Sequence, residues 1–317
     1  MNRLYLYRSI CFATVFACLL TVSCGENGRK SNQTQKTSRE FTLPSIPAII
    51  TNPSERADYL AGHYWDHLDF SDTSLINKPE ILEQAFVNFL EIFPYVSEGA
   101  LRLAIRKTFE GAFVDNKMFA HITGLFERYL FDPNAPMRNE EYYSLVLDHL
   151  IASPQIDELD KVRFRFQQGQ VNKNRRGSVA ADFVYTLSNG RQGAMHKMVS
   201  EFTILFFNNP GCMACSEYQQ GLEYSPVITQ LVGAGRLKIL AMYVDEDLVS
   251  WEGYRSSIPS SWLNGYDASF VIRNDNLYDL RAIPSLYLLD REKRVLLKDA
   301  LPHQIEEQLL YLVQNPQ

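Results

Sequence analysis

Cysteine is scarce in this chain. The 317 residues contain five cysteines, and only Cys212 and Cys215 lie beyond the first 24 residues. This count argues against the framework of several disulfides that stabilises small secreted domains. A structural zinc site is also disfavoured, because no second Cys-x-x-Cys and no well-spaced Cys/His pair accompanies this one. His63 and His67 have the spacing of metal ligands, but no glutamate follows His63 as in the zincin motif, so we expect no metal.

Basic charge is also limited. The formal net charge is −6, and the sequence has no dense basic tract interleaved with aromatic residues. Such a tract is the usual mark of a nucleic-acid-binding face, so we expect no nucleic-acid partner. The hydrophobic content of 46% and the charged content of 21% are those of an ordinary globular protein. A chain of 317 residues is expected to form two domains.

The apolar run near the N-terminus is short. Residues 9–23 follow Arg3 and Arg8 with no acidic residue between, and the run is too short for a comfortable membrane span. We therefore predict that residues 1–23 are a signal peptide. The run ends in Leu20-Thr-Val-Ser-Cys24-Gly25, which resembles a bacterial lipoprotein box with Cys24 as the lipidated residue. The alternative is ordinary secretion with a free Cys24.

Lipidation would leave the mature protein tethered to a membrane through its lipid. We therefore expect the protein in the cell envelope, facing the periplasm. The outer membrane is favoured, because Gly25 stands where enteric bacteria place an aspartate as a retention mark. Residues 24–41 are polar and show no apolar periodicity, which predicts a flexible tether.

The stretch from residue 201 to Cys215 carries the chemistry. Residues 202–207 form a short run of β-branched and aromatic residues, which predicts a buried strand. Turn residues 208–211 follow, and a helical pattern extends from Cys212 to about Leu231. Cys212 is thus expected at a helix N-terminus, where unpaired N–H groups and the helix dipole favour the thiolate. Cys215, one turn further on, can then resolve a mixed disulfide that Cys212 forms by attacking a substrate.

A second signal lies downstream, where Ile283-Pro284 immediately precedes an apolar strand. Together the two segments resemble the thioredoxin superfamily. An added hairpin expected at 180–199 and an insertion around 245–275 resemble its membrane-tethered thiol-disulfide oxidoreductases in particular. The resemblance implies that the Ile283–Pro284 bond is cis and faces the dithiol. It also implies that the backbone of Ile283 pairs with a substrate chain like an added strand, which makes Ile283 and Pro284 substrate-binding residues.

We accordingly expect residues 173–317 to form a thioredoxin-like α/β domain. Its expected elements are an added N-terminal hairpin at 180–199, a strand at 237–244, an insertion around 245–275 and a closing helix at 302–313. Trp251 and Trp262 in the insertion are expected to anchor the loop or the core rather than to line a substrate groove.

Residues 42–172 are predicted to form a separate all-α domain. Apolar residues recur every three or four positions in six segments, which start near Asn52, Pro79, Ser97, Met118, Asn139 and Asp157. Short connections rich in Pro, Asn and Gly favour an antiparallel bundle. The segments 59–70 and 79–94 resemble the uncharacterised helical domain that precedes thioredoxin-like domains in Bacteroidetes lipoproteins, which by itself implies no chemistry.

Two functions remain open at this point. The first is a lipid-anchored thiol-disulfide oxidoreductase that acts on protein thiols and disulfides, needs no cofactor and depends on an envelope redox partner. The second is a non-catalytic binding module with a structural disulfide, in which the helical domain recruits an envelope partner. Gly211 replaces the usual tryptophan before the first cysteine, and Phe206 replaces the buried acid of many thioredoxins; both favour the second. A thiol peroxidase is a third possibility. It is weaker because such peroxidases usually have a threonine three residues before the reactive cysteine, and here that position is Asn209.

Overall fold

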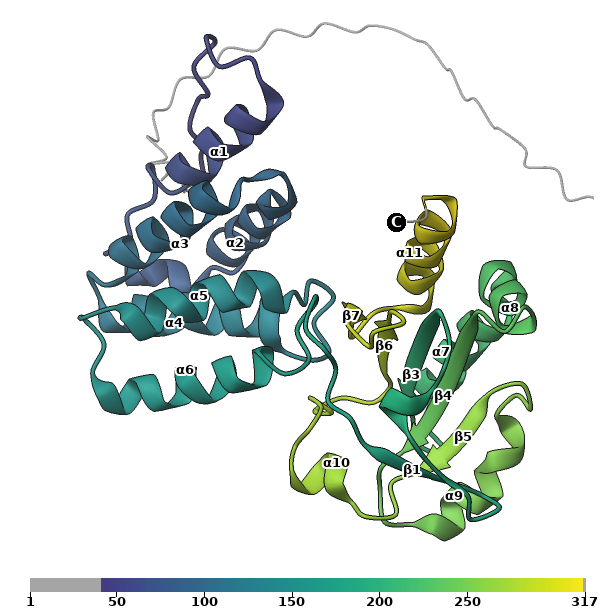
Figure 1. Ribbon diagram of the computed structural model, residues 1–317. Helices are drawn as coiled ribbons and strands as arrows, with labels where there is room; N and C mark the ends of the chain where they lie inside the picture. The colour runs from purple at the N-terminus through teal and green to yellow at the C-terminus, as the bar shows by residue number, and fades with distance from the viewer. Residues whose placement is uncertain (1–40, 316–317) are drawn as a thin grey trace, which may run out of the picture. The chain divides into compact units, whose positions relative to one another are not determined.

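The computed structural model describes residues 41–315 (Figure 1). The predicted signal peptide, Cys24 and all of the predicted tether except Phe41 lie outside the described residues. The described residues belong to one compact unit. Within residues 41–315, no helix combines the length and hydropathy needed to cross a membrane.

A helical region comes first, as predicted. Its α-helices are α1 (Pro53–His63), α2 (Leu82–Glu91), α3 (Glu98–Ala112), α4 (Asn116–Phe126), α5 (Glu140–Ala152) and α6 (Glu158–Val171). The shorter elements are η1 (Thr73–Asn77), η2 (Phe93–Tyr95) and the π-helical turn η3 (Glu127–Phe131). Side chains of Asn52, Ser97, Asn139 and Asp157 cap α1, α3, α5 and α6, so these predicted starts are confirmed. Helix α2 begins at Leu82 rather than near Pro79, because a tight turn from Lys78 to Ile81 precedes it.

Aromatic rings fill the core between these helices. Phe86 of α2 packs edge-on against Phe126 of α4, with ring centroids 4.8 Å apart. Phe109 of α3 stacks on the same Phe126 at 5.4 Å. All three rings are fully buried. The apolar periodicity of the sequence therefore marks the inward faces of these helices correctly.

In the described part of the chain, seven strands form one sheet in the order β2-β1-β5-β4-β3-β6-β7. The strands are β1 (Val184–Leu187), β2 (Gln192–Ala194), β3 (Phe202–Phe207), β4 (Leu237–Tyr243), β5 (Leu263–Tyr266), β6 (Ser285–Leu289) and β7 (Val295–Lys298). Strand β3 lies between β4, which is parallel to it, and β6, which is antiparallel. Every residue of β3 is buried, as its unbroken apolar run predicts.

Different elements pack against the two faces of the sheet. Ile204 and Phe206 of β3 pack on one face against α7 (Met213–Glu223), α8 (Pro226–Gly233) and α11 (Pro302–Gln314). Leu205 and Phe207 point to the other face, which is covered by the segment around Phe183 and Met195 and by residues that follow α10 (Val271–Asn274). This alternation follows from the two-residue period of a strand. The α/β thioredoxin-like fold with a preceding helical region is thereby confirmed.

Two details differ from the sequence prediction. The single helical pattern after Cys212 is divided into α7 and α8, because Ser225 caps a new helix that has Pro226 at its first position. The predicted insertion contains α9 (Leu248–Tyr254), η5 (Arg255–Ser257) and strand β5, which pairs with both β4 and β1. Trp251 and Trp262 are buried there, as expected for anchoring residues. The exact boundary at residues 172/173 stays a prediction.

Candidate redox site

Cys212 lies where strand β3 passes into helix α7. After β3 ends, a short turn leads to Gly211, whose φ of 71° is in the left-handed region that glycine adopts most easily. Cys212 itself has extended backbone and is the N-cap of α7, and its Sγ accepts a hydrogen bond from the Cys215 N–H at 3.1 Å. The predicted placement of this sulfur at a helix N-terminus is therefore confirmed. That position stabilises negative charge on the sulfur when the thiol ionises.

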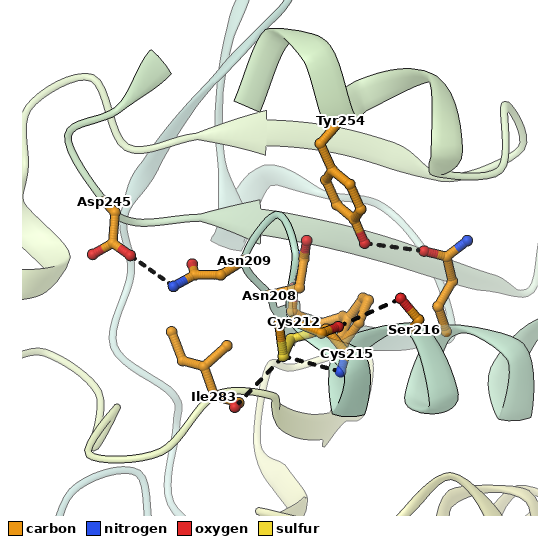
Figure 2. The surroundings of a disulfide bond; sticks show 10 residues. Asn208, Asn209, Cys212, Cys215, Ser216, Asp245, Tyr254 and Ile283 are labelled. Carbon is orange, nitrogen blue, oxygen red and sulfur yellow. Dashed lines mark hydrogen bonds between the residues drawn. A yellow bond between two sulfur atoms is a disulfide. The ribbon is translucent and has the colours of Figure 1, made fainter. Parts of the chain in front are cut away.

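The two cysteines form a disulfide with a Cα–Cα distance of 5.2 Å (Figure 2). Cys215 is fully buried, whereas Cys212 is only half-buried. An incoming sulfur therefore reaches Cys212 first. This asymmetry is the one that the predicted roles of nucleophile and resolving thiol require, and those roles stay predictions.

The segment before strand β6 faces the disulfide. The Ile283–Pro284 peptide bond is cis, as the resemblance implied. The Ile283 carbonyl oxygen lies 3.9 Å from Cys212 Sγ (Figure 2). Within residues 41–315 the Ile283 N–H donates no hydrogen bond, because Ile283 lies outside the ladder that joins β3 to β6. An unpaired backbone edge is thus placed beside the sulfur, and its role in substrate binding stays a prediction.

Side-chain amides hold the turn that carries Cys212. Asn208 Nδ2 donates to the Phe206 carbonyl at 3.0 Å, and Asn208 is buried. Asn209 Nδ2 donates to Asp245 Oδ2 at 2.7 Å, which ties the turn to the loop after β4 (Figure 2). Asp245 in turn pairs with Arg273 of α10. The turn is therefore held from its own strand and from the neighbouring loop.

The interior beneath the disulfide is apolar. Phe206, which occupies the position of the thioredoxin acid, is fully buried and contacts Trp262 edge-on at a centroid distance of 6.3 Å. Glu217, the acidic residue of α7 that follows Cys215 most closely in the sequence, is exposed. Neither position supplies a buried carboxylate for proton transfer to Cys215.

A buried carboxyl lies elsewhere in the site, and sequence reasoning missed it. Asp299 follows β7, and its Oδ1 accepts a hydrogen bond of 2.5 Å from the Ser285 hydroxyl, one residue after the cis proline. Burial raises the pKa of the Asp299 carboxyl, and the nearby Arg138 guanidinium opposes this rise. No local signal at residue 299 indicated this, because both partners are distant in sequence.

The prediction that the protein binds no metal can be compared with the described residues only. His63 Nδ1 lies 2.7 Å from Asp66 Oδ2. Over residues 41–315, no group of three or more His, Cys, Asp or Glu side chains is arranged to hold a metal ion.

Comparisons with known proteins agree with this fold. A family model described as a domain of unknown function (DUF5106) matches residues 23–174. A crystal structure of a thioredoxin-like protein from Bacteroides caccae is 47% identical, covering 86% of this chain and 98% of that one with a TM-score of 0.82. Such a score over this span requires the helical and thioredoxin-like regions to superpose together.

Two further structures match the C-terminal part. The C-terminal domain of an uncharacterized protein from Bacteroides fragilis is 51% identical over 44% of this chain and 99% of that one, with a TM-score of 0.43. The thioredoxin domain of a thiol-disulfide oxidoreductase from Bacteroides vulgatus is 16% identical over 44% of this chain and 98% of that one, with a TM-score of 0.40. No curated protein matches the sequence.

Fold and site together define a thioredoxin-fold protein that carries a Cys-x-x-Cys disulfide opposite a cis proline. The identity and coverage of the Bacteroides caccae protein then place this chain in a particular group. The chain belongs to the thioredoxin-like proteins with a helical N-terminal region.

Proposed function

We propose that this protein is a thiol-disulfide oxidoreductase that acts on protein disulfides in the cell envelope, anchored by a lipid on Cys24. One observation carries the proposal: a half-buried sulfur at a helix N-terminus is bonded to a fully buried one and lies 3.9 Å from the Ile283 carbonyl. This arrangement lets a disulfide exchange partner approach one sulfur only. A relative from Bacteroides vulgatus carries the name thiol-disulfide oxidoreductase, which supports the same assignment.

The reaction begins with the reduced dithiol. The Cys212 thiolate attacks one sulfur of the substrate disulfide, forming a new S–S bond while the substrate's own S–S bond breaks. The departing substrate thiolate takes a proton from solvent. Cys215 then loses its proton and attacks Cys212 Sγ, which releases the second substrate sulfur as a thiol. Two electrons pass to the substrate, and the protein is left with the Cys212–Cys215 disulfide.

Each turnover consumes the dithiol, so a dithiol donor must reduce the protein again. We propose an envelope redox partner in this role, replaced in vitro by dithiothreitol. Because the apolar surroundings of Phe206 offer no acid, water is the proposed proton carrier for Cys215.

The test measures the reduction potential of the Cys212–Cys215 pair in the full-length protein, by equilibration with glutathione or dithiothreitol buffers. A potential between roughly −270 and −120 mV is that of a redox-active pair, and a value below about −300 mV is that of a structural disulfide. The second result would favour the binding-module alternative.

Trapping supplies the matched control. Cys215→Ser is expected to accumulate a mixed disulfide with a protein disulfide such as insulin, detected by mass spectrometry, whereas Cys212→Ser is expected to form none. The lipid anchor has a separate test, because Cys24→Ser should move the protein from the membrane to the soluble fraction.

A further inference from the structure

A groove of about 370 Å³ adjoins the redox site, and a loop of the helical region forms one of its walls. Its lining includes Ala214 and Tyr218 of α7 together with the cis-proline segment Ala282–Pro284. The lining also includes the four-residue segment Pro133-Asn-Ala-Pro136, here named the 133–136 loop. The groove therefore continues directly from the backbone edge that faces Cys212.

The loop is held in place at both ends. Before it, the Phe131 ring stacks under the Arg281 guanidinium at 3.7 Å. After it, Arg138 Nη2 donates to Asp299 Oδ2 at 2.8 Å. The same carboxyl accepts from Ser285, which follows the cis proline, so two side-chain bonds link the loop to the substrate edge.

These contacts belong to a cluster of opposite charges that is largely buried, with Arg281 at its exposed edge. Three basic and three acidic side chains alternate in it, and we name it the charged cluster: Arg138, Arg281, Lys298, Glu140, Asp279 and Asp299. Arg138 and Glu140 come from the helical region, and the other four come from the thioredoxin-like region. Through Arg138, these ion pairs connect the end of the 133–136 loop to Asp279 and Asp299 of the thioredoxin-like region.

Disulfide exchange determines what occupies the groove. In the mixed disulfide the substrate cysteine is bonded to Cys212, so its neighbours along the chain must pass Ile283. Two residues of extended chain span roughly 7 Å, which brings residues close to the substrate cysteine into the groove. Its occupant is therefore the segment of the substrate polypeptide that flanks the reacting cysteine.

The walls of the groove indicate the chemistry of that segment. The 133–136 loop and the cis-proline segment carry no charged side chain, and the two charged residues in the lining, Arg138 and Asp299, are paired with each other. A charged substrate side chain would lose hydration here without gaining an oppositely charged partner. Uncharged residues beside the substrate cysteine are therefore favoured.

We propose that the 133–136 loop is a substrate-specificity element, through which the helical region selects protein disulfides flanked by uncharged residues. This inference rests on the proposed oxidoreductase function and adds a role for the helical region.

The test uses Asn134→Trp in the full-length protein. Asn134 is exposed and its side chain forms no hydrogen bond within the described residues, so a larger ring fills the groove without removing a contact. Asn116→Trp, at an exposed position of the helical region away from the groove, is the matched control. Circular dichroism checks that both variants fold.

Three disulfide probes oxidise the reduced protein in single-turnover reactions, followed by thiol alkylation and mass spectrometry. They are a cysteine peptide dimer flanked by alanines, the same dimer flanked by glutamates, and the small uncharged 2-hydroxyethyl disulfide. Wild type should prefer the alanine peptide to the glutamate peptide by about tenfold or more. Asn134→Trp should slow oxidation by the alanine peptide by about tenfold, while changing the rate of oxidation by 2-hydroxyethyl disulfide less than about twofold.

The outcomes separate the two proposals. If Asn134→Trp reacts with the alanine peptide as fast as Asn116→Trp does, or slows the small and peptide probes equally, the specificity role is wrong and the redox function stands. If reduced wild type reacts with none of the three probes, the oxidoreductase function itself fails.

Discussion

Replacing Arg138 by methionine tests the charged cluster most directly. Its Nη2 lies 2.8 Å from Glu140, 2.8 Å from Asp299 and 3.4 Å from Asp279. The side chain of Arg138 is 14% exposed, and those of its three acidic partners are 10%, 12% and 1% exposed. Methionine keeps much of the aliphatic volume but removes the cation, which leaves Arg281 and Lys298 to balance three buried carboxylates.

The expected loss of unfolding free energy follows from the burial of Arg138 and its acidic partners. Removing one partner of a buried, hydrogen-bonded ion pair costs about 3–5 kcal/mol of unfolding free energy, because the remaining charge is uncompensated. Arg128→Met is the control, since Arg128 is 61% exposed and pairs with Glu83, which is 23% exposed. An ion pair at the surface contributes about 0–1 kcal/mol.

The loss of unfolding free energy in Arg138→Met should also depend on pH, which a simple loss of packing would not. Burial raises the pKa of Asp299, so the folded state binds its proton more tightly than the unfolded chain does. Stability from this group is present at low pH and is lost as the pH rises through the folded-state pKa. Loss of the opposing Arg138 charge raises that pKa further, and each additional unit costs about 1.4 kcal/mol above it. The deficit of Arg138→Met should therefore be larger at about pH 8 than at about pH 5.

Asp279 does not reverse this expectation. Burial acts to raise its pKa, but the Arg281 guanidinium, together with the charges of Arg138 and Lys298, outweighs this and the pKa of Asp279 is lowered. The stability that it contributes is present at higher pH and is lost as the pH falls. Arg138 provides part of it, so removing Arg138 also enlarges the deficit at the higher pH.

Urea unfolding, followed by circular dichroism and tryptophan fluorescence at both pH values, measures these differences. The reasoning is refuted if Arg138→Met loses no more than Arg128→Met, or if its deficit is the same at both pH values.

Three further predictions concern the site and its support. Iodoacetamide added at one equivalent to the reduced protein should alkylate Cys212 rather than the buried Cys215, as peptide mass spectrometry would show; equal labelling would contradict the exposure difference. Phe206→Ala should cost about 3–5 kcal/mol in urea unfolding, because the ring is fully buried against Trp262; a loss below about 1 kcal/mol would contradict this. Asn52→Ala should cost about 1 kcal/mol, because its Oδ1 accepts from the Ser54 and Glu55 N–H groups at 2.8 and 3.3 Å, whereas Asn52→Asp should cost little.

Much of the fold could be predicted because its signals are local. At the starts of α1, α3, α5 and α6, a polar N-cap side chain accepts a hydrogen bond from a backbone N–H group in the first turn of the helix. An unbroken apolar run marks strand β3, and the turn after it positions Cys212 at the start of α7. Each of these features depends on residues within about one helical turn, so the physical preference can be recognised in a short window.

Elements that need a distant partner could not be predicted in this way. Strand β5 has the sequence Leu-Asn-Gly-Tyr, which lacks strand periodicity, and it forms because β4 and β1 lie on either side of it. The division between α7 and α8 is local, since Ser225 and Pro226 mark it, but the continuing apolar pattern obscured it.

The sequence by itself indicated the Cys212–Cys215 pair and the strand that leads to it, because these depend on short-range backbone preferences. The cis proline opposite the pair was implied by the resemblance to the thioredoxin superfamily. Only the tertiary structure decided which charges are buried together. Arg138 and Asp299 are 161 residues apart in the sequence, and arginine and aspartate are usually surface residues, so nothing in the sequence marks them as a buried pair. Their pairing, and the groove beside the 133–136 loop, exist because folding brings the two regions together and removes water from between them.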